Sequence, residues 1–504
     1  MARMKVLMLN PPFMKKYSRQ SRSPCVTKSN TVYYPYYLAY AAGAVEKAGF
    51  DVKLVDGVTN EWSHEDTAKF AGQLNPGLVV IDTSTPSVVN DVQVAARIKE
   101  ALPGTHINLV GTFPTNMTDY TFGMSPAIDS VCIKEYDYTT RDLALAIEAG
   151  KPLNAVEGLA FRENGNIIKN PPRPFIQNLD ELPFVSEIYL KHFGEEGIKK
   201  YFYASTTWPE IMMLTARGCA WNCTFCNIPM KQSYRMRSVN SVADEFEFIQ
   251  SEMPFVNEVM IEDDTFPTAL VRTRQLCDEF IKRGIKVTWS CNARVTTDME
   301  TMKKMKEAGC RLMCVGFESA TQDILNTIEK KSTMNRQYEF MGEARKAGLK
   351  VNGCFIFGLP GDTPETMQKT IEMAKALNPN SAQFYPLMVY PGTQAYQWAK
   401  ETGYLGTEDF SKWNTEEGLH KTTVERPGLS SGEVLHWCNK ARLEFYTNRK
   451  FISKMIKQAA TNPTEAVRIA KASRVLFRHL FKYAVTKDAK VGAQEKIPVT
   501  AGSG

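Results

Sequence analysis

The chain has 504 residues, of which 43% are hydrophobic and 23% are charged, and its formal net charge is +6. The length suggests two to four domains, and the ordinary composition excludes collagen-like, low-complexity and largely disordered proteins. The charge is concentrated, because residues 434–486 hold eleven Lys and Arg against two Asp and Glu. The rest of the chain is therefore close to neutral, and the total makes no strong case for nucleic acid as a partner.

The first 150 residues alternate short apolar strands with amphipathic helices. Strands are expected at residues 5–9, 51–56, 76–82, 107–111 and 128–133, and helices at 34–49, 91–102 and 139–149. Apolar, β-branched strands separated by helices are typical of a parallel sheet that is covered on both faces. We predict an α/β, doubly wound (Rossmann-like) domain over residues 1–150, in which ligands bind beyond the carboxyl ends of the strands. A connector is expected over residues 151–205, with a hairpin at Asn164-Gly165 and a Pro-rich link after it.

A second alternation occupies residues 206–395. Its strands are expected at 211–215, 258–261, 286–290, 312–316, 351–357 and 382–387, with helices at 241–252, 269–283, 298–308, 322–329, 336–347 and 364–376. Six strand–helix pairs fit a partial (β/α)6 barrel, in which the chemistry lies at the carboxyl ends of the strands. Residues 396–490 are predicted to be a helical C-terminal region, and residues 491–504 a disordered tail.

Within the C-terminal region, residues 464–484 form a basic amphipathic pattern. Basic residues recur every three or four positions opposite an apolar face, namely Arg468, Lys471, Arg474, Arg478 and Lys482. Such a helix either lies on an anionic membrane surface or docks its apolar side on the barrel. RNA is a lesser alternative, because aromatic residues are interleaved only modestly, and we regard nucleic acid as an unlikely partner.

The number of cysteines and the N-terminal residues indicate the cellular compartment of the protein. Eleven cysteines in a chain of this length are sparse for a secreted disulfide scaffold, and MARMKVLMLNPP resembles a strand and turn rather than a secretory signal. The longest uncharged stretch, residues 29–45, is too short and too polar to span a membrane. We expect a cytoplasmic protein, with the basic tail as a means of peripheral attachment at the inner membrane face.

The sharpest motif is ARGCAWNCTFCNIP, which places Cys219, Cys223 and Cys226 in a C-x3-C-x2-C arrangement after the first strand of the second alternation. Three thiolates are one fewer than the set that closes a zinc site or a four-iron cluster. A cluster held by three cysteines keeps one iron open, and S-adenosylmethionine can chelate that iron. The alternatives are a structural zinc knuckle and three unrelated buried thiols. Paired C-x2-C hooks and a nearby histidine, which would favour zinc, are missing.

This motif and the six strand–helix units after it resemble the radical S-adenosylmethionine superfamily. The preceding doubly wound domain resembles that of the cobalamin-binding subgroup, so that the likeness covers roughly residues 4–405. The resemblance implies a [4Fe-4S] cluster on the three cysteines, bound S-adenosylmethionine, a 5′-deoxyadenosyl radical and an electron donor such as flavodoxin or ferredoxin.

The resemblance also assigns contacts with S-adenosylmethionine to single residues. These are Phe225, which matches the aromatic residue before the third cysteine; Asp263 and Asp264, in IEDDTF, for the methionyl ammonium group; Arg294 for the carboxylate; Glu318 and Ser319 for the ribose; and Gly358 and Gly361, in the adenine-backing loop. From the residues alone, the two aspartates could instead cap a turn, and Arg294 could be a salt-bridged residue of the barrel rim. The glycines form a turn by their own chemistry.

For the first domain, the resemblance implies a corrin ring against the carboxyl edge of the sheet. That edge offers small, hydroxylated and polar residues, namely Asn10, Pro11, Thr83, Ser84, Gly111, Thr112 and Glu135. Cobalamin folds that supply an axial histidine use an Asp-x-His-x-x-Gly loop, whereas the loop here is DGVTNEW and His64 comes too late to serve. We expect cobalamin without a protein histidine ligand, the alternative being a degenerate domain that binds none.

The expected function is methylation or rearrangement of an unactivated carbon of a lipid, glycolipid or other secondary metabolite. This substrate class rests on a weak likeness to hopanoid- and lipid-tailoring members of the family. The alternative is a tRNA- or peptide-modifying methyltransferase or methylthiotransferase. Neither an accessory RNA-binding module nor a second cysteine triplet is apparent in the sequence. A cofactor carrier without activity would leave the barrel loops unexplained.

Overall fold

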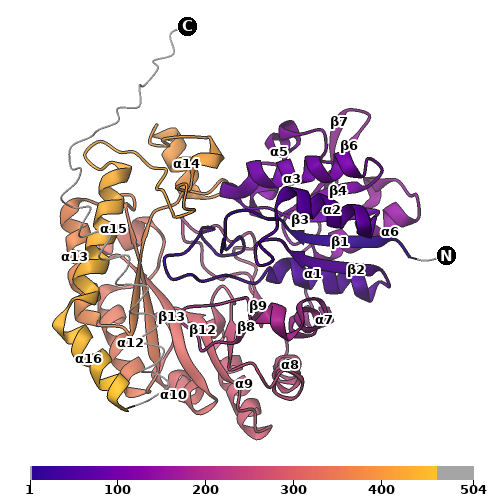
Figure 1. Cartoon of the computed structure of the whole chain (residues 1–504). Coiled ribbons are helices and arrows are strands. Elements are labelled where there is room, and N and C mark those ends of the chain that lie inside the picture. The colour runs from indigo at the N-terminus through magenta and orange to yellow at the C-terminus, as the bar shows by residue number, and fades with distance from the viewer. Residues whose placement is uncertain (1–2, 462–504) are drawn as a thin grey trace.

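The computed structural model describes residues 3–461 and shows two α/β units followed by a helical C-terminal region (Figure 1). The basic helix predicted over residues 464–484 and the tail predicted over 491–504 lie outside the described residues. Among the helices that are described, none is both long enough and apolar enough to cross a membrane.

The first unit is built on a seven-stranded sheet in the order β2-β1-β3-β4-β5-β6-β7. The strands are β1 (Lys5–Asn10), β2 (Asp51–Asp56), β3 (Leu78–Asp82), β4 (His106–Val110), β5 (Ser130–Cys132), β6 (Leu159–Glu163) and β7 (Asn166–Lys169). The first five run parallel, which confirms the doubly wound prediction. The hairpin at Asn164-Gly165 is present and adds two antiparallel strands beside β5.

Apolar residues alternate along these strands between two cores. Val6 and Met8 of β1 belong to the core that contains α1 and α6, whereas Leu7 and Leu9 belong to the core that contains α3. The helices of this unit are α1 (Tyr36–Lys47), α2 (His64–Leu74), α3 (Val88–Ala101), α4 (Thr112–Asn116), α5 (Thr118–Met124), α6 (Asp137–Glu148) and α7 (Val185–Ile198). Strands that are apolar on both faces are what a doubly covered parallel sheet requires.

The second unit is a six-stranded parallel sheet in the order β15-β14-β13-β12-β11-β8. Its strands are β8 (Glu210–Met213), β11 (Glu258–Ile261), β12 (Thr288–Ala293), β13 (Cys310–Glu318), β14 (Lys350–Phe357) and β15 (Ser381–Pro386). The strands pair in chain order, so β8 and β15 are the two edges and the barrel is open. The predicted partial (β/α)6 barrel is therefore confirmed.

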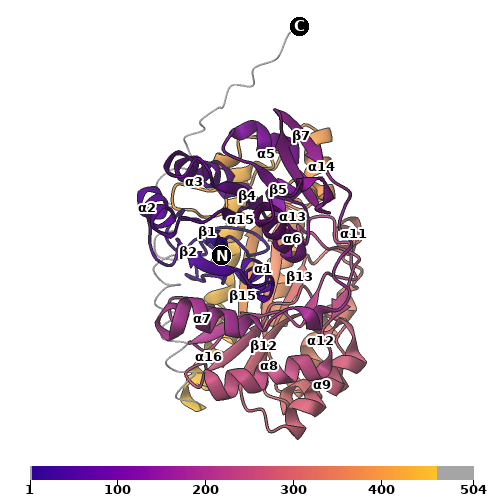
Figure 2. The same cartoon turned by 90° about the vertical axis from the view of Figure 1, so that its right-hand side faces the viewer.

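Helices cover the outer side of the barrel, as Figure 2 shows for α8 and α9. They are α8 (Val239–Glu252), α9 (Leu270–Lys282), α10 (Met299–Glu307), α11 (Gln322–Thr327), α12 (Met334–Lys346) and α13 (Pro364–Leu377). After the barrel come α14 (Gln394–Glu401), α15 (Ser431–Tyr446) and α16 (Arg449–Thr461). The C-terminal region is helical as predicted, except that residues 402–430 are largely irregular.

This irregular segment ties the barrel to the first unit. It buries Phe410 and Trp413 in the same apolar core as α3. The Phe410 ring lies 4.8 Å from the ring of Phe113, which follows β4. The sequence analysis did not distinguish this segment from the helices around it, because aromatic residues that anchor a loop leave no periodic pattern.

A buried network of opposite charges also joins the two units. Both terminal nitrogens of Arg217 donate to the Asp137 carboxylate, at 2.6 and 3.0 Å, and one also donates to Glu135 at 2.9 Å. Glu135 accepts a further bond from Arg235 at 2.8 Å. None of the four side chains is more than 8% exposed. Arg217 lies in β9 (Ala216–Arg217) and Arg235 in β10 (Arg235–Met236), so the network fixes the loop between them against the first sheet.

Replacing Asp137 by alanine should destabilise the protein strongly, because it removes the main counter-ion of a buried guanidinium. Breaking a buried ion pair from one side costs about 3–5 kcal/mol. The matched control is Asp119→Ala, since the Asp119 side chain is 70% exposed and its pair with Lys169 should contribute less than about 1 kcal/mol. Urea unfolding of both variants measures the difference. Equal losses would show that the Arg217 network does not stabilise the interface.

Candidate functional site

The three predicted iron ligands lie on residues 218–234, the loop between β9 and β10, which we call the cysteine loop. Gly218 begins the loop with a φ of 80°, and a Cβ at this position would lie 2.6 Å from the carbonyl oxygen of Met230. The backbone N–H of Gln232 donates to the carbonyl of Cys219 at 2.7 Å. The loop therefore closes on itself directly before the first cysteine, and only glycine fits there.

The thiols are free and grouped in one loop. Cys219 and Cys223 are buried, and Cys226 is half-buried. In the part of the chain that the structure describes, no three His, Cys, Asp or Glu side chains are arranged to hold one metal ion. Zinc needs its ligands around a single centre, whereas the cysteines of a cubane cluster each bind a different iron and stand further apart. Three thiols on one loop match the ligand number that the sequence analysis expects for a cluster with one open iron.

Asp263, one of the two aspartates at the end of β11, holds the start of the cysteine loop. Its carboxylate accepts bonds from the backbone N–H and the hydroxyl of Thr215, both at 2.6 Å, and from the backbone N–H of Ala216 at 3.0 Å. The side chain is fully buried. With these three donors, Asp263 is a structural residue in this conformation and its carboxylate is not open to a ligand.

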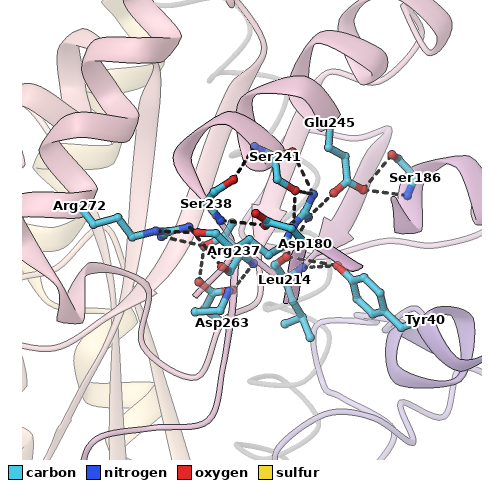
Figure 3. Close-up of polar contacts among 12 residues, drawn as sticks. Tyr40, Asp180, Ser186, Leu214, Arg237, Ser238, Ser241, Glu245, Asp263 and Arg272 are labelled. Atoms are coloured by element: carbon cyan, nitrogen blue, oxygen red, sulfur yellow. Dashed lines mark hydrogen bonds and ion pairs between the residues drawn. The ribbon is translucent and has the colours of Figure 1, made fainter. Parts of the chain in front are cut away.

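Two buried arginines reinforce the same junction (Figure 3). Arg237 donates to the carbonyl of Leu214 at 3.2 Å and forms an ion pair with Glu245. Arg272 donates to the carbonyls of Thr215, at 3.2 Å, and of Arg237, at 2.8 Å. The end of β8 is therefore held from several sides, and Cys219 follows a fixed strand end.

Asp264 and its neighbour Glu262 present unused acceptors. The Oδ2 atom of Asp264 and the Oε2 atom of Glu262 are buried and have no hydrogen-bond partner within residues 3–461. Arg22 lies beside both, 3.3 Å from Glu262 and 3.8 Å from Asp264. Burial raises the pKa of Glu262 to about 7, although Arg22 lowers it. Two carboxylates that share one guanidinium can accept a further cation, and the methionyl ammonium group fits this need.

Glu262 and Arg22 were missed by the sequence analysis. Glu262 precedes the two predicted aspartates in IEDDTF, so its position could have been found. Arg22 carries no motif and reaches the site from 240 residues earlier in the chain.

Arg294 contacts the cysteine loop. Its Nη1 atom lies 3.5 Å from the sulfur of Cys223, and its guanidinium lies 4.4 Å from the ring centre of Trp221. The predicted contact with the methionyl carboxylate remains a prediction. Phe225, in the same loop, is half-buried against the apolar core that contains α3.

The predicted ribose and adenine contacts lie on neighbouring strand ends. Glu318 ends β13 with a φ of 65°, an uncommon conformation for a residue other than glycine, and pairs with the buried Lys330 at 2.6 Å. Ser319 is buried beside it. Gly358 and Gly361 follow β14 in the expected turn, where both have positive φ. The strand order places these residues on the same barrel rim as the cysteine loop.

A cavity of about 90 Å³, partly open to solvent, lies between the first sheet and the cysteine loop. Its walls are formed by the carboxyl ends of β3, β4 and β5, by residues 19–22 and Pro24, by residues 227–230 of the cysteine loop and by Asp264. Of the predicted edge residues, Thr83, Gly111, Thr112 and Glu135 line it.

The end of β4 lies close against the residues that follow β3, beside the cavity. Gly111 has a φ of 118°, and a Cβ there would lie 2.1 Å from the carbonyl oxygen of Thr83. The hydroxyl groups of Thr83 and Tyr136 are buried without hydrogen-bond partners. Unpartnered buried hydroxyls beside a cavity are suited to a polar ligand, and the nucleotide tail or amide groups of a cobalamin provide such partners.

The other predicted edge residues are covered by the chain itself. Arg19 donates to the side chain of Asn10 and, at 3.0 Å, to the carbonyl of Pro11. The hydroxyl of Tyr17 lies 3.0 Å from that of Ser84. Residues 17–19 therefore cover Asn10, Pro11 and Ser84. Among the described strand ends of the first sheet, the cavity borders only those of β3, β4 and β5.

The two aspartates should respond differently to substitution by asparagine. Asp263→Asn disturbs a carboxylate that accepts two backbone bonds, and it should lower the free energy of unfolding by about 1–3 kcal/mol. Asp264→Asn should leave that free energy within about 1 kcal/mol and weaken S-adenosylmethionine binding to the reconstituted protein about tenfold or more. Urea unfolding and calorimetry measure the two quantities. The reverse pattern would contradict this division of roles.

Two protein-family models match the chain. The Radical SAM superfamily model matches residues 213–374, which contain the cysteine loop, and the B12 binding domain model matches residues 22–144. The matched ranges coincide with the barrel and with the doubly wound unit. Together they confirm the predicted cofactor set of a [4Fe-4S] cluster, S-adenosylmethionine and cobalamin.

Curated relatives extend along most of the chain. An uncharacterized methyltransferase of Pyrococcus horikoshii is 30% identical and aligns over 90% of this chain and 95% of its own length. An anaerobic magnesium-protoporphyrin IX monomethyl ester cyclase of Rubrivivax gelatinosus is 26% identical over 83% of this chain and 74% of its own. A hopanoid C-3 methylase of Methylococcus capsulatus is 22% identical over 78% of this chain and 73% of its own.

The fold agrees with these alignments. The solved structure of the cobalamin-dependent S-adenosylmethionine radical enzyme OxsB, with aqua-cobalamin and S-adenosylmethionine bound, superimposes with a TM-score of 0.69 at 15% identity. The match covers 96% of this chain and 73% of that one. From the two matched domains, their order and the full-length relative, we conclude that the chain belongs to the radical S-adenosylmethionine superfamily, in the subgroup that carries an N-terminal B12-binding domain.

Proposed function

We propose that this protein transfers a methyl group to an unactivated carbon of a small-molecule or lipid substrate held between its two units. One observation carries the proposal: a single cavity is bordered by the carboxyl edge of the B12-binding sheet, by the cysteine loop and by Asp264. A substrate in this cavity would be exposed to both cofactor sites at once.

When bound, the cluster with S-adenosylmethionine supplies a carbon-centred radical that removes a hydrogen atom, and cobalamin supplies the methyl group. The residues of the chain position the cofactors and the substrate and shield them from water. Asp264 and Glu262 offer carboxylate oxygens for the ammonium group, and Arg22 orients both carboxylates. The network around Arg217 holds the cysteine loop against the first sheet.

The segment that contains residues 19–24, which borders the cavity, is held in place by residues that follow β15. The hydroxyl of Ser23 lies 2.8 Å from the Nε2 atom of His420 and 2.9 Å from the hydroxyl of Tyr390. The backbone N–H of Val26 donates to the carbonyl of Gly418 at 2.8 Å. Exclusion of water prevents side reactions of a reactive intermediate.

The cavity walls support a substrate with substantial apolar surface. Tyr36, Tyr37 and Tyr136 line it together with Ile228 and Met230. Relatives named for hopanoid and protoporphyrin ester substrates act on molecules with extended carbon frameworks. A lipid is supported further by α16, where Ile452 and Ile456 are 43% and 65% exposed among basic residues, as at a membrane surface. Transfer to tRNA or to a peptide is the alternative.

Anaerobic reconstitution with iron, sulfide and cobalamin, followed by incubation with methyl-labelled S-adenosylmethionine, tests the proposal. Lipid extract, a small-molecule extract and RNA are supplied in parallel, and 5′-deoxyadenosine and product mass are measured. We expect 5′-deoxyadenosine together with a labelled product from the lipid or small-molecule arm. Labelled RNA would favour the alternative, and an intact cluster that yields no 5′-deoxyadenosine with any substrate would refute radical chemistry.

Cys223→Ala should abolish the brown absorbance near ~400 nm and the formation of 5′-deoxyadenosine together, because three thiolates are needed to hold the cluster. Cys438→Ala is the matched control, since this buried cysteine lies on α15 away from the cysteine loop. The control should retain both properties. Retained cluster absorbance in Cys223→Ala would mean that this triplet is not the ligand set.

A further inference from the structure

Arg294 is a buried cation without a carboxylate partner. It follows β12, is 6% exposed, and forms no ion pair within residues 3–461. Its Nη2 atom donates to the carbonyl of Lys330, and its Nε atom has no hydrogen-bond partner among the described residues. By contrast, Arg217 and Arg237, which are also buried, each bind at least one carboxylate.

A thiol of the cysteine triplet lies beside this guanidinium. The Nη1 atom of Arg294 lies 3.5 Å from the sulfur of Cys223. A buried cation is costly unless an anion accompanies it. Cys223 becomes that anion when it binds iron, because the metal ligand is the thiolate.

Arg294 is held in this position by the parts around it. The ring of Trp221, two residues before Cys223, lies under the guanidinium, with 4.4 Å between the Arg294 carbon and the ring centre. Residues 328–330 lie against the cysteine loop as well, since the backbone N–H of Thr224 donates to the carbonyl of Ile328 at 3.2 Å. The donor is therefore fixed relative to the sulfur by contacts within the chain.

We propose that Arg294 is a positioning residue that raises the reduction potential of the iron–sulfur cluster through the sulfur of Cys223. The inference rests on the proposed function, because it presupposes a cluster on the triplet. Reduction adds one electron, and a positive charge with an N–H donor beside a ligand sulfur stabilises the more negative, reduced state. This role differs from the predicted contact with the methionyl carboxylate, which acts only when S-adenosylmethionine is bound.

The decisive measurement is the midpoint potential of the reconstituted cluster in the absence of S-adenosylmethionine, by a redox titration followed by electron paramagnetic resonance. Arg294→Gln should make the cluster at least tenfold harder to reduce, which is a shift of about 59 mV to lower potential for a one-electron couple. Arg294→Lys keeps the charge and should give a smaller shift. Arg97→Gln, at a surface arginine that is 62% exposed, is the matched control and should not shift the potential.

An unchanged potential in Arg294→Gln, with weaker binding of S-adenosylmethionine, would overturn the proposal and assign Arg294 to the carboxylate instead. If Arg294→Gln assembles no cluster, the midpoint potential is measured in Trp221→Leu instead. Loss of the ring frees the Arg294 guanidinium and should also lower the potential. Wild-type protein that binds no iron and sulfide would refute the cluster and hence the proposed function, an outcome distinct from an unchanged potential.

Discussion

Arg217 and Asp137 form a buried ion pair. Because neither charge can be hydrated in the interior, each charge is stabilised by its partner. The arginine immediately precedes Gly218 and the first cysteine, while the aspartate begins α6 of the B12-binding unit. A bidentate pair fixes both distance and orientation. The catalytic loop of one domain is thereby held at a defined position against the cofactor edge of the other, and the cavity between them takes its shape from this constraint.

The same logic separates the acids at the end of β11 into one with hydrogen-bond donors around it and two with free acceptor oxygens. The Asp263 carboxylate accepts three hydrogen bonds from backbone and hydroxyl donors, so it stabilises the strand end that precedes the cysteines. Among the described residues, one carboxylate oxygen of Asp264 and one of Glu262 are buried without a hydrogen-bond donor. A protein retains such unsatisfied buried oxygens at a cost, and a bound cation relieves that cost. Adjacent residues in one short motif thus serve the fold and the site separately.

Much of this architecture follows from local patterns. Strand–helix alternation predicts both parallel sheets, and the spacing of Cys219, Cys223 and Cys226 predicts the loop on which the chemistry depends. What could not be predicted depends on contacts between distant segments. Arg22 contacts Glu262, which lies 240 residues later in the chain, and no motif around Arg22 indicates this contact.

For some of the predicted site residues, the sequence indicated the position but not the role. Asp263 and Asp264 are chemically identical in the sequence, and only the position of Thr215 decides which of them is already satisfied. Asn10 and Pro11 were expected at the open edge of the sheet, but Arg19 from the following loop covers them. Periodicity reports which face of an element is buried, whereas it does not report which loop folds back over the end of that element.

The central claim of this account is that the cluster and the cobalamin serve one cavity. The most direct test is electron paramagnetic resonance of the reconstituted protein that contains cob(II)alamin, recorded with the cluster oxidised and then reduced. Two paramagnets that face one cavity should interact, so we predict that reduction of the cluster broadens or splits the cob(II)alamin signal. A cob(II)alamin signal that is identical before and after cluster reduction would contradict the claim.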